Sequence, residues 1–246
     1  MSYKLQPEIH TFPDGSSLAQ AVAREWVEAT AGSRNSARPF NVALAGGSTP
    51  QKMFRELSRP KISRQISWKN IHVFWGDERC VPPDHPESNY RSAWVSGLKY
   101  WPLTQDQVHR IRGENDPSQE ADRYAREIRD GVEEGGAPLF DWIFLGMGAD
   151  GHTASLFPGV PLQTEPLNIC GVATHPESGQ KRISLTLETL NRARRVSFLV
   201  TGRDKAERVS EILCSPAGDS KWPAGQVRAG RVEWFLDQAA AALLQD

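Results

Sequence analysis

The sequence predicts an α/β fold in which a mainly parallel sheet is covered by helices on both faces. Short apolar segments alternate along the chain with longer amphipathic ones, which is the order expected of strand–helix–strand units. Most of the short segments, such as 71–75 and 196–200, are predominantly apolar instead of alternating with polar residues. That pattern is typical of strands that are buried on both faces of a sheet.

Length and composition are compatible with one domain, which we expect to span residues 1–246. Hydrophobic residues make up 39% of the chain and there are 8 tryptophans, so a sizeable core is possible. The 29 basic and 30 acidic residues give a formal net charge of -1, which argues against a nucleic-acid partner. Any anionic ligand must therefore be held by local positive charge.

The N-terminal residues contain no apolar signal core, and no apolar run approaches the ~20 residues of a membrane-spanning helix. The three cysteines, Cys80, Cys170 and Cys214, are widely spaced and lack a C-x-x-C motif, which suggests reduced thiols. The sequence therefore predicts a cytoplasmic protein without a membrane partner.

The order of the expected elements follows from the apolar segments and the turn residues between them. The strands that we expect are 8–12, 41–45, 71–75, 108–112, 140–145, 169–173, 182–187, 196–200 and 232–236. The helices that we expect are 16–31, 50–57, 91–98, 117–132, 188–193, 206–213 and 237–244. Ser16 or Ser17 is the expected N-cap of the first helix.

The loop at 46–50 reads Gly-Gly-Ser-Thr-Pro and leads from a buried strand into a helix. Pro50 suits a first helical turn, and Ser48 as N-cap with Gln51 would complete a capping box. The two glycines let backbone N–H groups face outward at a helix N-terminus, which is a ready site for a phosphate. An ordinary strand-to-helix turn explains the same residues equally well.

The third expected strand ends in a loop that carries Asp77, Glu78 and Arg79. Two carboxylates and an arginine at this position predict part of a site, a solvated charged turn or an internal aspartate–arginine ion pair. Asn89 and Arg91, near the start of the next helix, can point back toward the same loop.

The most informative stretch is 140–158, in which a buried strand runs directly into a glycine-rich loop. Glycine occupies three of the positions from 146 to 151, and Asp150 and His152 lie in the same loop. A flexible loop at the carboxyl end of a buried strand is where an open α/β sheet usually binds its ligand.

Three hypotheses compete for this loop. A G-x-G-x-x-G dinucleotide fingerprint needs a long helix next, but the prolines between 158 and 166 leave room for only a short one. A calcium loop needs acidic or amide ligands where glycines stand here. The third hypothesis is an acid/base pair at the mouth of a sugar-phosphate site, in which His152 changes charge near neutral pH. A histidine that caps a helix start is the structural alternative.

The three loops together carry Gly-Gly-Ser-Thr-Pro, Asp-Glu-Arg-x-Val-Pro and Gly-x-Gly-x-Asp-Gly-His, in that order. This ordered set resembles the family of 6-phosphogluconolactonases and glucosamine-6-phosphate deaminases, over nearly the whole chain. Within the family the chain is similar to the lactonase branch, because Arg79 stands where the deaminases have tyrosine. After His152 it reads Thr-Ala-Ser-Leu-Phe-Pro, without the Asn-Glu-Pro that supplies the deaminases with a glutamate partner.

The resemblance implies a Rossmann-like parallel sheet, no metal and no cofactor. It implies hydrolysis of a small sugar-phosphate lactone, 6-phospho-D-glucono-1,5-lactone, to 6-phosphogluconate in the oxidative pentose phosphate pathway. Two other functions remain open: a deaminase, which would need the missing acidic partner of His152, and a sugar-phosphate sensor, which should carry a DNA-binding segment ahead of the sheet.

For lactone hydrolysis, one general base that deprotonates water is sufficient, and His152 is the expected base. Asp150 either orients it or holds sugar hydroxyls, and Arg79 or backbone N–H groups stabilise the oxyanion. Asp77 binds hydroxyls or pairs with Arg79. The residues expected to bind phosphate or the rest of the substrate are Gly46, Gly47, Ser48, Thr49, Asn89, Arg91, Arg182 and Lys205. Lys205 taken alone is better explained as a surface lysine.

Overall fold

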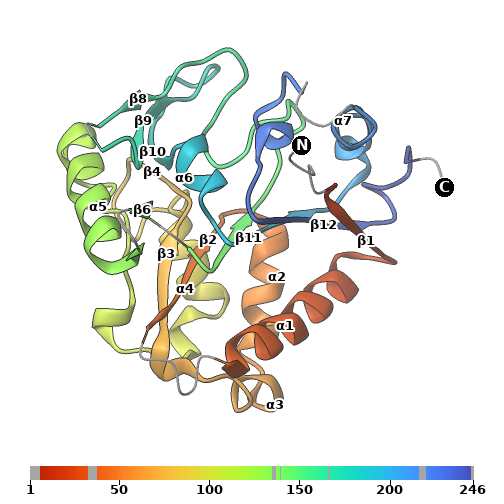
Figure 1. The fold of residues 1–246 in the computed structure, drawn as a ribbon, viewed down its shortest axis with the longest axis horizontal. Helices are drawn as coiled ribbons and strands as arrows, with labels where there is room; N and C mark the ends of the chain where they lie inside the picture. Colours follow the sequence, from red (N-terminus) through yellow and green to blue (C-terminus); the bar gives the residue numbers. More distant parts are fainter. Residues whose placement is uncertain are drawn as a thin grey trace.

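Six parallel strands form the central sheet of the computed structural model (Figure 1). Their order across the sheet is β1 (Glu8–Phe12), β12 (Arg231–Asp237), β11 (Arg195–Val200), β7 (Trp142–Leu145), β2 (Phe40–Leu44) and β3 (Ile71–Trp75). The structure describes residues 6–32, 38–134, 137–138, 140–165, 167–215 and 220–244. The predicted α/β fold with a mainly parallel sheet is confirmed.

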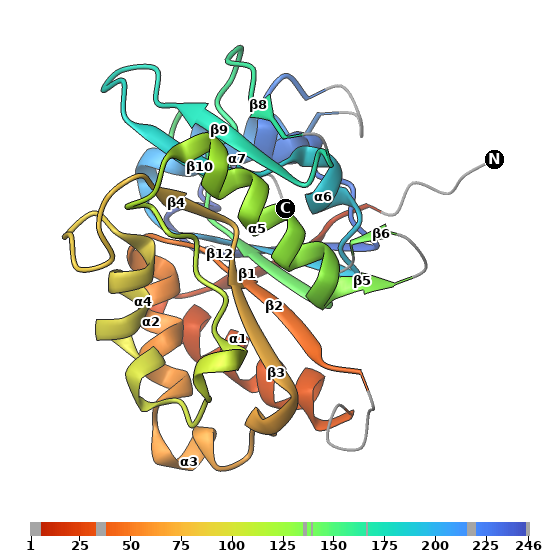
Figure 2. The same cartoon turned by 90° about the vertical axis from the view of Figure 1, so that its left-hand side faces the viewer.

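Helices cover both faces of this sheet (Figure 2). On one side lie α1 (Gly15–Ala31), α2 (Ser48–Leu57) and α4 (Asn89–Ser96). On the other side lie α5 (Pro117–Val132), α6 (Leu187–Asn191) and α7 (Ala206–Leu213). The short elements are α3 (Pro60–Ser63), η2 (Trp68–Asn70), η3 (Leu98–Tyr100), η4 (Gln105–Gln107), η5 (Arg203–Lys205), η6 (Pro223–Gln226), β5 (Glu133–Glu134) and β6 (Ala137–Pro138).

The core follows from the sequence pattern of the strands and of α1. Leu18, Val22 and Trp26 recur at helical spacing on α1 and are fully buried. The Trp26 ring stacks on Phe144 of β7 with 5.5 Å between ring centroids, an arrangement that stabilises beyond the area it buries. This packing fixes α1 on the sheet and leaves the carboxyl ends of the strands free to carry loops.

A second sheet, which the sequence analysis did not separate from the first, lies above the carboxyl edge. It is antiparallel and consists of β4 (Asp77–Arg79), β10 (Lys181–Leu185), β9 (Cys170–Thr174) and β8 (Gln163–Thr164). Residues Asp77 to Arg79 are therefore a strand and not the solvated turn that was one of the predictions. The backbone N–H and C=O groups of these three residues find hydrogen-bond partners on β10, about 100 residues away in sequence.

Four local predictions were wrong. The segment 108–112 is not a strand, because it contributes a single bridge between Val108 and Val73. Asp14, not Ser16 or Ser17, caps α1, because its carboxylate accepts the N–H groups of both serines at 2.8 Å. The N-cap of α2 is Gly47, so the helix begins at Ser48 and no side-chain capping box forms.

The predicted C-terminal helix is replaced by the end of β12 and a series of turns. The Asp237 side chain accepts hydrogen bonds from the N–H groups of Gly202, at 3.0 Å, and Ala240, at 2.8 Å. These contacts hold the chain against the loop after β11. Across the described ranges, no helix is both long and apolar enough to cross a membrane.

Candidate active site

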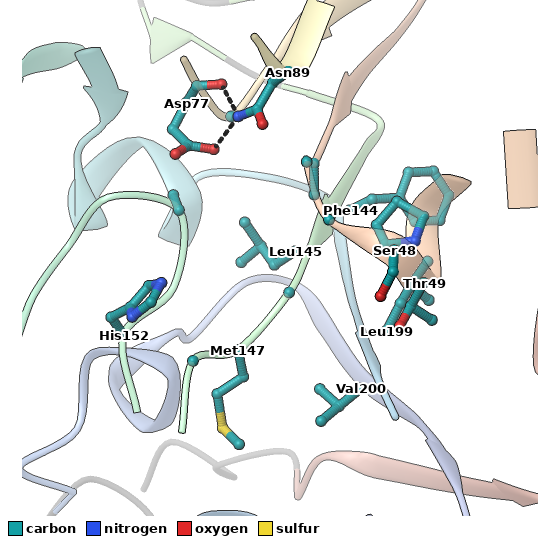
Figure 3. A pocket seen from close by; sticks show the side chains of 18 of the residues that line it. Ser48, Thr49, Asp77, Asn89, Phe144, Leu145, Met147, His152, Leu199 and Val200 are labelled. Atoms are coloured by element: carbon teal, nitrogen blue, oxygen red, sulfur yellow. Dashed lines mark hydrogen bonds between the residues drawn. The ribbon is translucent and has the colours of Figure 1, made fainter. Parts of the chain in front are cut away.

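The loops after β2, β3, β7 and β11 meet at one cavity of about 230 Å³ (Figure 3). Because carboxyl ends of parallel strands share one edge of a sheet, segments far apart in sequence converge there. The predicted site residues that line the cavity are Gly46, Gly47, Ser48, Thr49, Asp77, Arg79, Asn89, His152, Arg182 and Lys205.

Two predicted residues do not line the cavity. Asp150 lies beside it and contacts His152. Arg91 follows Asn89 by two residues in α4, a rotation of about 200° around the helix. Asn89 therefore faces the cavity while Arg91 does not line it.

The wall formed by the start of α2 presents backbone N–H groups and hydroxyls. Gly47 has a φ of 100°, a conformation that favours glycine, and no side chain caps the helix. The Thr49 hydroxyl lies 2.7 Å from that of Thr201, which connects this wall to the loop after β11. Lys205 ends that loop, and its ammonium group forms an ion pair with Asp204 at 2.9 Å. A helix N-terminus and one lysine thus line the same cavity, and we call this part the anion-binding corner for the ligand that such groups favour.

Asp77 lies at the opposite wall of the cavity, where Asn89 and Ser155 bind it. The Asn89 amide donates to its backbone oxygen at 2.9 Å and to its Oδ1 at 3.1 Å, and the Ser155 hydroxyl donates to its Oδ2 at 2.7 Å. The side chain is buried, and among the described contacts it forms no ion pair with Arg79, contrary to one of the expectations. Gly46 packs so closely here that a Cβ would lie 1.9 Å from the Asn89 Oδ1.

Glu78, which the sequence analysis did not assign to the site, connects β4 to the start of α4. Its buried carboxylate accepts the N–H groups of Arg79, Asn89 and Tyr90 and the hydroxyl of Ser88, all within 2.9 Å. Burial raises the pKa of Glu78, and these four donors oppose that shift. Glu78 thus fixes the backbone from which two cavity residues project.

Arg79 and Arg182 lie directly opposite each other on β4 and β10. Burial and the charge of Arg79 both lower the pKa of Arg182, which is only 9% exposed. The Arg79 Nε is buried without a hydrogen-bond partner among the described residues, while its Nη1 donates to the Glu87 carbonyl at 2.6 Å. Like charges across a strand pair are unfavourable, so an anion between the two guanidinium groups would stabilise this arrangement.

His152 and Asp150, the two residues predicted to act as an acid/base pair, contact each other in the glycine-rich loop. The His152 Nδ1 lies 2.6 Å from the Asp150 Oδ1, which also accepts the His152 N–H at 3.2 Å. Burial tends to raise the pKa of Asp150, but the charge and hydrogen bonds of His152 outweigh it and hold this pKa below its usual value. The Phe157 ring packs on the imidazole with 5.0 Å between centroids. Asp150 thus engages one ring nitrogen of His152 and leaves Nε2 for other contacts.

The loop closes on itself around this pair. The Gly148 N–H donates to the His152 carbonyl at 2.9 Å, and the Thr153 hydroxyl donates to the Gly146 carbonyl at 2.8 Å. Gly148 has no room for a side chain, because a Cβ would lie 2.2 Å from the His152 Nδ1 and 2.3 Å from the Asp150 Oδ1. This close approach is the structural reason for glycine at that position.

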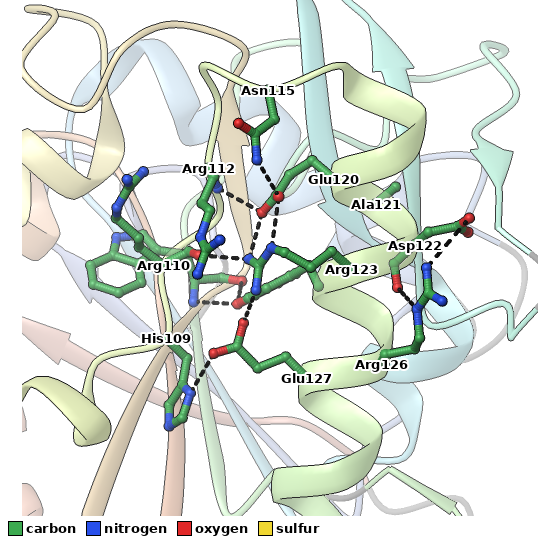
Figure 4. Close-up of polar contacts among 12 residues, drawn as sticks. His109, Arg110, Arg112, Asn115, Glu120, Ala121, Asp122, Arg123, Arg126 and Glu127 are labelled. Carbon is green, nitrogen blue, oxygen red and sulfur yellow. Dashed lines mark hydrogen bonds and ion pairs between the residues drawn. The ribbon is translucent and has the colours of Figure 1, made fainter.

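A polar network on α5 supports the strand that carries Arg79 (Figure 4). Glu120 accepts the N–H of Arg112 at 2.7 Å and pairs with Arg123 at 2.6 Å. This fixes Gly113, where a Cβ would lie 2.3 Å from the Arg79 carbonyl oxygen. The network thereby holds the segment next to the end of β4.

Cys80 follows β4 but does not line the cavity. Burial, with a further contribution from the charge of Glu78, raises the pKa of its thiol to about 11. The thiolate is therefore a minor species at neutral pH, and a covalent role for Cys80 is disfavoured.

We expect Cys80→Ser to change kcat for the substrate by no more than about twofold, since the thiol is protonated at neutral pH. The measurement is steady-state turnover of the purified variant against the unmodified enzyme. A loss of several orders of magnitude with the fold intact would instead identify Cys80 as a nucleophile.

One group of residues with metal-type ligands lies within the described ranges, Glu8, His10 and Glu233 on β1 and β12, with its ligand atoms within 4.8 Å of one another. Arg231 already pairs with both carboxylates, at 2.6 and 2.9 Å. None of the three residues lines the cavity.

The fold and the cavity define a class of protein: an α/β protein with a histidine–aspartate pair beside a cavity with cationic side chains at the carboxyl edge of its sheet. The model of the family described as glucosamine-6-phosphate isomerases/6-phosphogluconolactonase matches residues 13–235. The chain belongs to this family.

Similar proteins agree with the lactonase branch of the family. The 6-phosphogluconolactonase of Haemophilus influenzae is 41% identical over 236 residues, which cover 95% of this chain and 98% of that relative. The rat 6-phosphogluconolactonase is 37% identical over 94% of this chain and 89% of its own. The solved structure of the 6-phosphogluconolactonase from Trypanosoma cruzi superposes with a TM-score of 0.84 at 27% identity and covers all of both chains. The resemblance inferred from the three loops is confirmed.

Proposed function

We propose that the protein hydrolyses 6-phospho-D-glucono-1,5-lactone to 6-phospho-D-gluconate, the second step of the oxidative pentose phosphate pathway. The observation that carries the proposal is the His152–Asp150 pair, which faces a cavity with cationic side chains on its walls. The lactonases to which the chain is similar support the choice of substrate. The free thiols of all three cysteines fit a reducing cytoplasm.

In this proposal His152 takes a proton from the water molecule that attacks the lactone carbonyl carbon. The carbonyl electrons move to the carbonyl oxygen, and positive charge from the Arg79 and Arg182 pair stabilises this oxyanion. Collapse of the intermediate breaks the bond to the ring oxygen, which receives the proton back from the His152 imidazolium. Asp150 holds the ring and stabilises its charged form. Since the lactone carbonyl is already electrophilic, no metal is needed.

The substrate phosphate, in this proposal, binds at the start of α2. Outward N–H groups at a helix N-terminus and a nearby lysine are a favourable environment for a dianion. Ser48, Thr49 and Lys205 line that corner. The sugar ring then extends toward Asp77 and Asn89, whose polar groups suit hydroxyls.

We expect Lys205→Ala to raise KM, and to weaken binding of 6-phosphogluconate, by about 10- to 100-fold, because it removes one charge-assisted hydrogen bond. The fall in kcat should be smaller, and the affinity for unphosphorylated gluconate should not change. Product binding can be measured by isothermal titration. Lys69→Ala is the matched control, because Lys69 lies in η2, next to the end of β3 that is remote from the cavity. Equal KM values for Lys205→Ala and unmodified enzyme would remove Lys205 from the phosphate site.

The test of the function is lactone hydrolysis. The lactone is generated in situ by glucose-6-phosphate dehydrogenase, and its disappearance is compared with the spontaneous rate. Glucosamine 6-phosphate is tested in parallel for release of ammonia. We expect acceleration of the first reaction alone. Ammonia release would support the deaminase alternative, and no acceleration of either reaction would overturn the proposal.

A further inference from the structure

The loop that carries Asp150 and His152 is held from outside the cavity by residues near the C-terminus. We propose that Arg208 and Trp222 are positioning residues for the Asp150–His152 pair, an inference that rests on the proposed function. Neither residue lines the cavity, so their effect on the reaction must pass through the loop.

The first observation concerns the two backbone carbonyl groups that flank Asp150. The carbonyl of Ala149 accepts a hydrogen bond from the Arg208 Nε at 3.3 Å. The carbonyl of Gly151 accepts one from the N–H of Ala224, the second residue of η6, at 3.1 Å. The peptide unit that precedes Asp150 and the one that precedes His152 are therefore anchored to a part of the chain that is about 60 to 75 residues away in sequence.

The second observation is the packing of Trp222 on Gly151. A Cβ at Gly151 would lie 2.9 Å from the Trp222 Cβ and 3.1 Å from two atoms of the indole ring. Gly151 also has a φ of 81°, which favours glycine. The indole thus occupies the space on the outer side of the loop, so that the loop cannot move outward without displacing it.

The third observation is that Arg208 and Trp222 hold each other. The Arg208 guanidinium stacks over the Trp222 ring at 3.7 Å from the centroid. The indole N–H donates to the Glu211 Oε2 at 2.8 Å, and Arg208 forms an ion pair with the same oxygen. Arg208, Glu211 and Trp222 each contact the other two, and we call these three side chains the clamp. The contacts of Arg208 with Ala149 and of Trp222 with Gly151 are therefore fixed together.

Loss of the contacts made by Arg208 and Trp222 should affect kcat and KM differently. Proton transfer depends on the distance between the His152 Nδ1 and Asp150, and displacement of a reacting group by about 1 Å can cost about 100-fold in rate. Lys205 directly precedes α7, but among the described contacts neither Arg208 nor Trp222 touches the side chains of Ser48, Thr49 or Lys205. We therefore expect loss of the clamp to lower kcat while KM stays near its original value.

The experiment uses the full-length enzyme with Arg208→Ala and Trp222→Ala. In each variant we expect kcat for lactone hydrolysis to fall by about tenfold or more with KM changed by less than about twofold. A second readout does not depend on activity. His152 keeps the pKa of Asp150 low, so this pKa, measured by NMR of the carboxyl carbon, should rise toward its ordinary value in both variants.

Two further variants distinguish positioning from a general structural role. Trp222→Phe keeps an aromatic face for Arg208 and should restore kcat toward that of the unmodified enzyme. Arg59→Ala removes an ion pair of the same i, i+3 spacing, with Glu56 at 3.1 Å, beyond the end of α2 remote from the cavity. It should change neither kcat nor the pKa of Asp150.

The clamp hypothesis is wrong if both Arg208→Ala and Trp222→Ala keep the kcat and the Asp150 pKa of the unmodified enzyme. Because the Arg208 side chain is partly exposed and lies outside the hydrophobic core, that variant should fold even where Trp222→Ala does not. If the unmodified enzyme does not accelerate lactone hydrolysis, the proposed function fails, and the Asp150 pKa still tests the clamp on its own.

Discussion

Replacement of His152 by alanine is expected to lower kcat for lactone hydrolysis by about 10²–10⁴-fold, the usual contribution of a general base. Without the imidazole, the attacking water keeps its proton in the transition state and Asp150 has no ring to orient. The loss should appear in kcat and not in KM, because the anion-binding corner at α2, where we propose that the substrate phosphate binds, is unchanged. The measurement is steady-state kinetics with the in situ lactone assay, together with titration of 6-phosphogluconate.

The fold should survive this change, since the His152 side chain is 27% exposed and its ring nitrogen contacts only the loop residue Asp150. His175→Ala is a matched control. The His175 ring also contacts Phe157, at the same 5.0 Å centroid distance as His152, but it does not line the cavity. Turnover of His152→Ala equal to that of His175→Ala would remove His152 from the role of base.

The second large effect is expected for Gly148→Ala. This change adds one methyl group and leaves the chemical identity of every polar side chain unchanged. The added Cβ would lie 2.2 Å from the His152 Nδ1 and 2.3 Å from the Asp150 Oδ1. Both distances are below any van der Waals contact, so the pair must separate. We expect a loss of kcat approaching that of His152→Ala, of about 100-fold or more. Binding of 6-phosphogluconate should change much less.

Gly146→Ala provides the comparison in the same loop. No atom outside the neighbouring residues lies within 4 Å of a Cβ at Gly146, so the histidine–aspartate contact should remain. NMR of the His152 ring nitrogens reports directly on that contact in both variants. If Gly148→Ala retains the contact and the turnover of the unmodified enzyme, the close approach at Gly148 has no functional importance.

The sequence by itself determined the fold class and the place of the site. Segments in which apolar residues do not alternate with polar ones predict strands that are buried on both faces. The glycine-rich or charged loops that follow these strands indicate one edge of a parallel sheet. The contact between His152 and Asp150 could be anticipated as well, because two residues in a short glycine loop cannot lie far apart. These are local properties, fixed by a few neighbouring side chains.

The tertiary structure alone decided how the site is supported, because each supporting contact joins residues remote in sequence. Ser155 binds Asp77 across 78 positions, and Arg182 faces Arg79 only because β10 pairs with β4. Spacing contains no signal for such contacts. The same cause explains why the expected Asp77–Arg79 ion pair does not form: Asn89 and Ser155, both remote in sequence, bind the Asp77 carboxylate instead. The loop that carries His152 and Asp150 could be identified from the sequence, whereas the contacts that hold it in place result from tertiary packing.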